Sequence, residues 1–136
     1  MKVTYQKFLE IFNTLSNQKI EREDKFGSAV VSLLLDYKDI YKKYYQKCFS
    51  INLACAYEEP GTLIVPKDAQ GNFLYTKVGR VKRESELRIL HEETEVDIPV
   101  CIIPLTDDLK VKLDIFTLNV LTGILFDRSE TAQPKI

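Results

Sequence analysis

Apolar residues near the start of the chain recur at intervals of three and four, which is the spacing of an amphipathic helix. The stripe consists of Tyr5, Phe8, Leu9, Phe12 and Leu15. Thr4 precedes it and is a favoured N-cap residue, because its hydroxyl can accept a hydrogen bond from the first turn. The pattern therefore predicts a helix that begins after Thr4 and ends near Leu15.

A second and much longer helical pattern runs from about Asp24 to Tyr57. Its apolar positions keep heptad spacing through Phe26, Val30, Leu33, Tyr37, Ile40, Tyr44 and Ile51, and no Pro or Gly interrupts it after Gly27. About 30 residues give a helix near 45 Å long, more than a compact domain of this size needs. We expect this helix either to form a helical hairpin with the first helix or to pair with a partner chain.

The middle of the chain predicts extended structure. Thr62–Val65 and Asn72–Thr76 flank a segment rich in turn-forming residues, Pro66–Gly71, which predicts a β-hairpin. Polar and apolar residues then alternate over Thr94–Ile98, as in a strand. The apolar run Val100–Ile103 is expected to continue in an extended conformation.

Two further helical patterns complete the predicted fold. Weak periodicity predicts a helix from Val78 to about Glu92, and Thr106 with two aspartates signals the N-terminus of a last helix. Thr117 offers an alternative cap for a separate short helix ending near Gly123. The predicted class is α+β, mainly α, with a helical hairpin, a β-hairpin, an extended strand and a C-terminal helix. We expect one domain over residues 1–128 and a polar tail over 129–136.

Composition narrows the classes of function. The chain has 136 residues, 45% of them hydrophobic, which suffices for one core without disulfides or metals. Its 19 basic and 20 acidic residues give a net charge of −1, so we expect no nucleic-acid partner. No apolar run approaches the ~20 residues that cross a bilayer, and the N-terminus lacks the apolar region of a signal peptide. We therefore expect that the protein does not associate with a membrane and that it is made in the cytosol.

Catalytic and metal-binding patterns are missing from the sequence. His91 is the single histidine and stands beside Glu92 and Glu93, whereas a helical zinc site needs two histidines four residues apart. The three cysteines show no C-x-x-C spacing, and there is no G-x-S-x-G nucleophile motif. We therefore predict a protein that is not an enzyme and has no catalytic residues, no cofactor and no metal.

Tyrosines and lysines alternate along the middle of the long predicted helix. The cluster contains Tyr37, Tyr41, Tyr44 and Tyr45, interleaved with Lys38, Lys42, Lys43 and Lys47. The tyrosines can belong to the core, anchor a protein interface or stack on nucleic-acid bases. If one face of the helix binds a protein partner, the candidate residues are Tyr41, Tyr45, Lys38 and Lys42.

The order of several short motifs resembles an uncharacterised family of small proteins encoded by tailed bacteriophages. The matching segments are Lys2 to Leu15, Lys25-Phe-Gly-Ser-Ala-Val30, the turn Asp68 to Gly71, Glu92-Glu-Thr-Glu-Val-Asp-Ile98, Leu105–Leu109 and Thr117–Phe126. In that family the segment before the Asp-x-x-Gly turn is more acidic and helical, whereas here it is the apolar Leu63-Ile-Val65. The resemblance supplies no activity and no site residues.

The resemblance and the missing catalytic motifs lead to two expectations of function. The first is a virion structural or assembly component that binds copies of itself or other phage proteins, as a homo-oligomer. The second is a phage-encoded inhibitor that binds a host defence protein or its nucleotide signal. Either protein is expected in the cytoplasm of the infected cell, and the first also in the virion.

Overall fold

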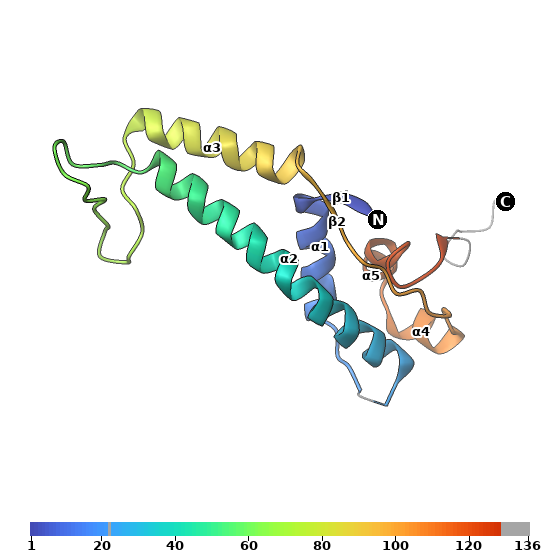
Figure 1. The fold of residues 1–136 in the computed structure, drawn as a ribbon. Helices are drawn as coiled ribbons and strands as arrows, with labels where there is room; N and C mark the ends of the chain where they lie inside the picture. The colour runs from blue at the N-terminus through green and yellow to red at the C-terminus, as the bar shows by residue number, and fades with distance from the viewer. Residues whose placement is uncertain (22, 129–136) are drawn as a thin grey trace. The chain divides into compact units, whose positions relative to one another are not determined.

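The computed structural model describes residues 1–21 and 23–128, and these residues form a mainly helical α+β fold (Figure 1). The predicted class is therefore confirmed. In chain order the elements are β1 (Lys2–Thr4), α1 (Tyr5–Ser16), α2 (Lys25–Cys55), α3 (Lys77–Glu92), β2 (Glu95–Asp97), α4 (Asp107–Lys112) and α5 (Ile115–Leu121).

The chain divides into two compact units. The first contains Met1–Ile40 and the chain from Glu95 onward, and the second is Tyr41–Thr94. Helix α2 contributes its residues up to Ile40 to the first unit and the rest to the second. The single domain predicted for residues 1–128 stays a prediction, and the predicted tail at 129–136 lies outside the described residues.

Helix α1 begins where the sequence predicts. The Thr4 side chain accepts a hydrogen bond from the Lys7 amide at 3.2 Å, which satisfies one donor of the first turn. The buried face contains Tyr5, Phe8, Ile11 and Leu15. The predicted stripe was wrong in detail, because Ile11 takes the fully buried position while Leu9 and Phe12 are only half-buried.

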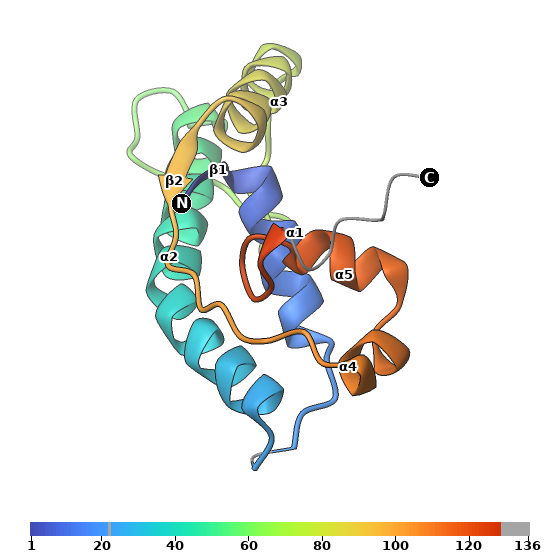
Figure 2. The ribbon, with the colours of Figure 1, turned by 90° about the vertical axis from the view of Figure 1, so that its right-hand side faces the viewer.

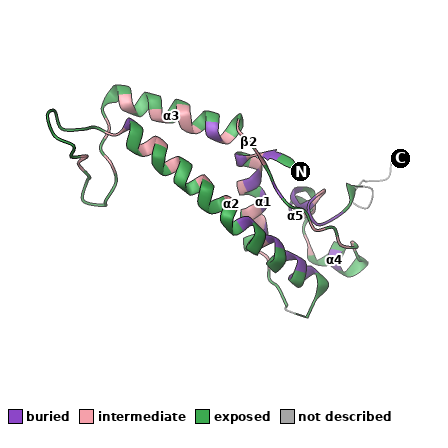
Figure 3. Cartoon of the chain, viewed as in Figure 1, coloured by how far each residue is buried: buried purple, intermediate pink, exposed green. Residues whose placement is uncertain are grey.

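The core of the first unit joins α1 to the N-terminal half of α2. The Phe8 and Tyr37 rings meet edge to face at 5.4 Å, and Phe26 stacks on Phe126 at 6.4 Å. Phe26, Val30, Leu33 and Tyr37 are all buried, as their heptad spacing predicts. Figure 3 shows this burial on α1 and on the first turns of α2. In this unit the apolar seam of α2 is therefore covered within the chain, as in the predicted helical hairpin.

Strand β1 was not predicted. It pairs antiparallel with β2 in the register Lys2↔Asp97, Val3↔Val96 and Thr4↔Glu95, and the two strands lie side by side in Figure 2. A strand of three residues carries too little alternation to be read from sequence. The predicted strand at Thr94–Ile98 is confirmed as β2, slightly shortened at both ends.

The extended run after β2 is held by hydrogen bonds to the turn that follows α5. The Cys101 amide donates to the Ile124 carbonyl at 2.9 Å, and the Ile103 amide donates to the Leu125 carbonyl at 2.7 Å. Ile124 and Leu125 are fully buried. The backbone of Val100–Ile103 is therefore extended, as predicted.

The C-terminal region forms two short helices, so the alternative of a separate short helix near Gly123 is correct and the single helix is wrong. Thr106 caps α4 as predicted, with its hydroxyl 3.3 Å from the Leu109 amide. Leu113 then adopts an extended backbone, and Asp114 caps α5 by accepting from the Thr117 amide at 2.6 Å. Asp114 is the stronger local capping signal, so Thr117 lies buried inside α5 and does not cap it.

The second unit consists of the C-terminal part of α2, the connecting segment and α3. The predicted β-hairpin is reduced to a turn with one antiparallel bridge, Lys67↔Phe73. Asp68 closes that turn by accepting from the Gln70 and Asn72 amides at 2.9 and 3.0 Å. No regular strand forms at either predicted position, because Leu63 and Leu74 are exposed and no packed layer covers them.

Helices α2 and α3 are packed against each other in this unit by close polar and backbone contacts. The Arg83 guanidinium donates to the Asn52 side-chain oxygen at 2.6 Å, and the Tyr44 hydroxyl is hydrogen-bonded to His91 Nε2. Gly79 lies so close to α2 that an added Cβ atom would be 2.5 Å from the Cys55 carbonyl oxygen. Only glycine fits there.

Candidate protein-binding face of the second unit

An uncovered line of apolar side chains follows α2 through the second unit. Its members are spaced four residues apart, so they lie on one face of the helix. We call them the apolar row; they are Tyr41, Tyr45, Phe49 and Leu53, which are 38%, 65%, 50% and 42% exposed. Side chains of this size are normally covered when they stand together in a folded protein.

The row is exposed because the covered face of α2 points elsewhere. Tyr44, Ile51 and Cys55 are partly or fully buried, and Tyr44 meets the His91 ring of α3 at 5.5 Å. Burial raises the pKa of the Tyr44 phenol well above its ordinary value, and the neighbouring Cys48 adds to that shift. Tyr45 is rotated about 100° from Tyr44 around the helix, so its side chain leaves the helix pair.

The connecting segment contacts the row at Phe49. The Phe73 ring lies 5.8 Å from the Phe49 ring, and the Lys67 ammonium is 5.3 Å from the centre of the Phe73 ring. Phe49 nevertheless keeps half of its surface exposed. The segment also carries Leu63, which is 97% exposed. The segment therefore adds apolar surface and leaves the row open.

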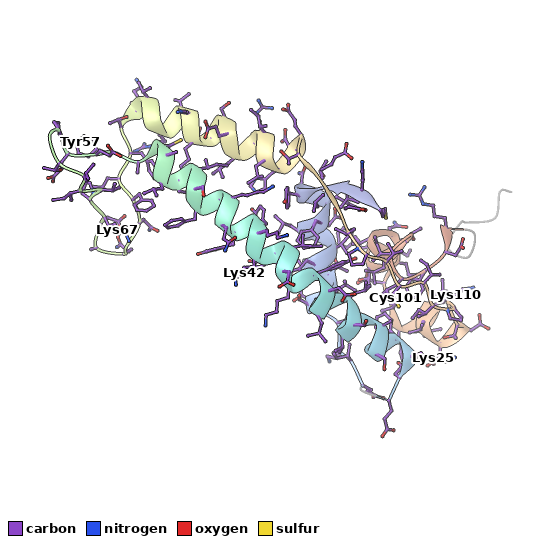
Figure 4. The ribbon with its side chains drawn as sticks, in the orientation of Figure 1. Lys25, Lys42, Tyr57, Lys67, Cys101 and Lys110 are labelled. Carbon is purple, nitrogen blue, oxygen red and sulfur yellow. The ribbon has the colours of Figure 1, made fainter. Side chains whose placement is uncertain are left out.

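Charges of opposite sign stand at the two ends of the row. Lys42 and Lys43 are exposed near its N-terminal end, and Glu58 and Glu59 are exposed just beyond the C-terminus of α2. Figure 4 shows Lys42 on the side of α2 away from α3, and Tyr57 just before the two glutamates. The ion pairs found among residues 1–21 and 23–128 include none of these four side chains.

The structure separates the four residues that the sequence singled out for partner binding. Tyr41, Lys42 and Tyr45 are exposed on α2 in the second unit, whereas Lys38 is exposed in the first. Sequence reasoning missed Phe49 and Leu53. The signal was present, because both continue the four-residue step from Tyr41 through Tyr45.

Other features of the described residues offer little chemistry. The His, Cys, Asp and Glu side chains that the structure places form no group of three that could hold a metal ion. A hollow of about 600 Å³ in the first unit is lined by the segment before α2 and by α4 and α5. Asp114 is in its wall, and the pKa of Asp114 is lowered by the hydrogen bonds from Thr117. That shift reflects helix capping.

Comparison with known proteins gives no indication of the function of this chain. No helix in the described part of the chain is long and apolar enough to cross a membrane. The chain matches no protein-family model, no curated protein and no solved structure.

Proposed function

We propose that this protein is a non-enzymatic binding component that works through the apolar row of α2. The observation that carries the proposal is the row itself, in which Tyr45 and Phe49 expose half or more of their surface. Tyrosine and phenylalanine are enriched at protein interfaces because they bury large areas at a small cost in side-chain freedom. We therefore expect a protein partner to bind to the apolar row.

The resemblance to small tailed-phage proteins supports a place in virion structure or assembly. Such a protein needs a surface for neighbouring subunits and no catalytic residues. Inhibition of a host defence protein would use the same row, so that role is an outcome of the experiment below. A nucleotide signal has less support: Lys43 and Lys47 line a hollow beside Leu90, but no residue of the apolar row lines it.

Site-specific cross-linking tests the proposal. Replacing Tyr45 by the photoreactive residue p-benzoylphenylalanine places the cross-linker in the middle of the row. In infected host cells, illumination should give discrete cross-linked species whose second component is a virion protein or this chain. The matched control carries the same residue at Val81, which is exposed on α3. Equal labelling from both positions, or no product from position 45, would contradict the proposal.

A virion assay addresses the narrower claim. Mass spectrometry of purified particles should find the chain at a fixed ratio to the major structural proteins. A protein that is abundant in infected cells but missing from particles, and cross-linked at position 45 to a host protein, would instead be an inhibitor.

A further inference from the structure

We propose that the apolar row binds a second copy of this chain, with the two α2 helices antiparallel about a two-fold axis near Phe49. The inference rests on the proposed function, because it names the partner of the same row. All the residues that carry it belong to the second unit.

The spacing of the row makes it complementary to itself. Tyr45 and Leu53 lie four residues before and four residues after Phe49. When one copy is turned end for end, Phe49 meets Phe49 and each Tyr45 meets Leu53 of the other copy. A two-fold axis needs a patch of this kind, in which the same surface serves on both subunits.

Charge selects the antiparallel direction. The end of the row near Lys42 and Lys43 is basic, and the end near Glu58 and Glu59 is acidic. Antiparallel helices bring each basic end to the acidic end of the other copy, whereas parallel helices would bring like charges together. Complementary charge steers association and penalises the wrong orientation. These four side chains form no ion pair among the described residues of one chain. Lys42 lies on the side of α2 away from α3, whereas Lys43 lines a hollow beside Leu90, so Lys42 is the main basic contact for a second copy.

The exposed area indicates a weak, reversible dimer. A buried aromatic side chain covers ~150–250 Å², so half-exposed Tyr45 and Phe49 each offer about 100 Å². With Tyr41 and Leu53 the row supplies roughly 350 Å², and its polar rim brings each partner to less than the ~800 Å² of a standard interface. We therefore expect dissociation in the micromolar range.

The outer face of α3 is the competing surface and is less suited to the role. Val78, Val81 and Ile89 are exposed there, but Lys82 and Ser85 stand between them. This face has no aromatic side chain, and the two glutamates at its C-terminal end, Glu92 and Glu93, each already lie 3.7 Å from Arg88 of the same chain. It therefore supplies the control position for the test.

Sedimentation velocity on the full chain tests the inference. The mean mass should rise from 15.7 kDa towards twice that value between about 1 and about 100 μM. Tyr45→Ser combined with Phe49→Ser should weaken the dimer by about tenfold or more, and Val81→Ser should leave it unchanged. Circular dichroism melts establish that each variant is folded. A monomer at every concentration would overturn the inference.

A charge-swap series tests the direction. Lys42→Glu with Lys43→Glu should weaken the dimer, and adding Glu58→Lys and Glu59→Lys to the same chain should restore it. A parallel dimer would not respond in this order, so failure of the restoration overturns the antiparallel arrangement.

The failure of the inference can be distinguished from that of the proposed function. A strict monomer whose position 45 cross-links to another virion protein refutes the second copy and keeps protein binding. A monomer that gives no cross-link at position 45 refutes both.

Discussion

Three tyrosines of α2 have the same chemistry and three different environments. Tyr37 is fully buried and donates a hydrogen bond to the Pro99 carbonyl at 2.7 Å; burial raises the pKa of its phenol. Tyr44 is half-buried and hydrogen-bonded to His91. Tyr45 is mostly exposed. The three side chains therefore serve a core, a contact between helices and an open surface.

Alanine substitutions should separate these environments. We expect Tyr37→Ala to lower the free energy of unfolding by about 3 kcal/mol or more, because it leaves a cavity in the core. Tyr44→Ala should cost about 2 kcal/mol, because it loses partial burial and a hydrogen bond. Tyr45→Ala should change stability by less than about 0.5 kcal/mol. Urea denaturation measures all three, and a loss for Tyr45→Ala equal to that for Tyr44→Ala would show that both are core residues.

At the residue scale, periodicity predicted the buried positions better than the exposed ones. Heptad spacing found Phe26, Val30, Leu33 and Tyr37, because a buried face repeats with the turn of the helix. The same spacing cannot say which apolar residue on the edge of that face is left uncovered. That depends on α3, whose packing on α2 is set by contacts between residues about thirty positions apart.

At the element scale, locally determined features were predictable and long-range ones were not. Thr4 and Thr106 were identified as helix caps because a cap bonds to an amide three residues away. Strand β1 was missed because its partner β2 lies more than ninety residues later. The predicted hairpin failed as regular strands because an isolated strand pair with no covering layer is marginal.

Gly79 gives a prediction for the contact between α3 and α2. Alanine is the better helix former by about 1 kcal/mol, so propensity alone predicts that Gly79→Ala stabilises the protein. The added Cβ would instead lie 2.5 Å from the backbone oxygen of Cys55, which cannot rotate away. We expect a net loss of about 1–2 kcal/mol in urea denaturation. Ser85→Ala on the same helix is the control and should be neutral or slightly stabilising; an equal gain in both variants would refute the close approach.

The Asp114 cap of α5 predicts a dependence on pH. Hydrogen bonds from Thr117 hold the pKa of this carboxyl below its ordinary value of 3.8. A lowered pKa in the folded state means that the cap stabilises the protein above pH 3.8 and that this contribution is lost as the pH falls through the folded-state pKa. Asp114→Ala should therefore lower the thermal midpoint at pH 7.

The difference between Asp114→Ala and the unmodified protein should narrow as the pH is lowered past 3.8. Thermal melts from neutral to acidic pH measure this difference. Asn119→Ala, at an exposed and non-titrating position of α5, is the control, and its difference from the unmodified protein should not change with pH. A difference between Asp114→Ala and the unmodified protein that is constant with pH would mean that ionisation of Asp114 does not support the cap.

At the scale of the whole molecule, the long helix was expected either to pack within the chain or to pair with a partner chain. These two expectations apply to different parts of α2. Up to Tyr37 its apolar seam is buried within the first unit. In the second unit, the side chains of the apolar row stay 38–65% exposed. The sequence could not divide the helix in this way, because both parts carry apolar residues at similar density. The uncovered part is the part that we assign to a second copy.

The fold as a whole is expected to depend on non-covalent packing alone. Cys48 and Cys55 are seven residues apart on one helix, about 10.5 Å along its axis, which exceeds the Cα separation of roughly 7 Å that a disulfide allows. Cys101 belongs to the other unit, and all three cysteines are free. A chelator or a reductant should therefore leave the thermal midpoint unchanged; a fall of several degrees with either would reveal a cross-link or metal.

Thiol labelling of the folded chain tests the burial of the three cysteines separately. Burial raises the pKa of the Cys55 thiol, so Cys55 should react last.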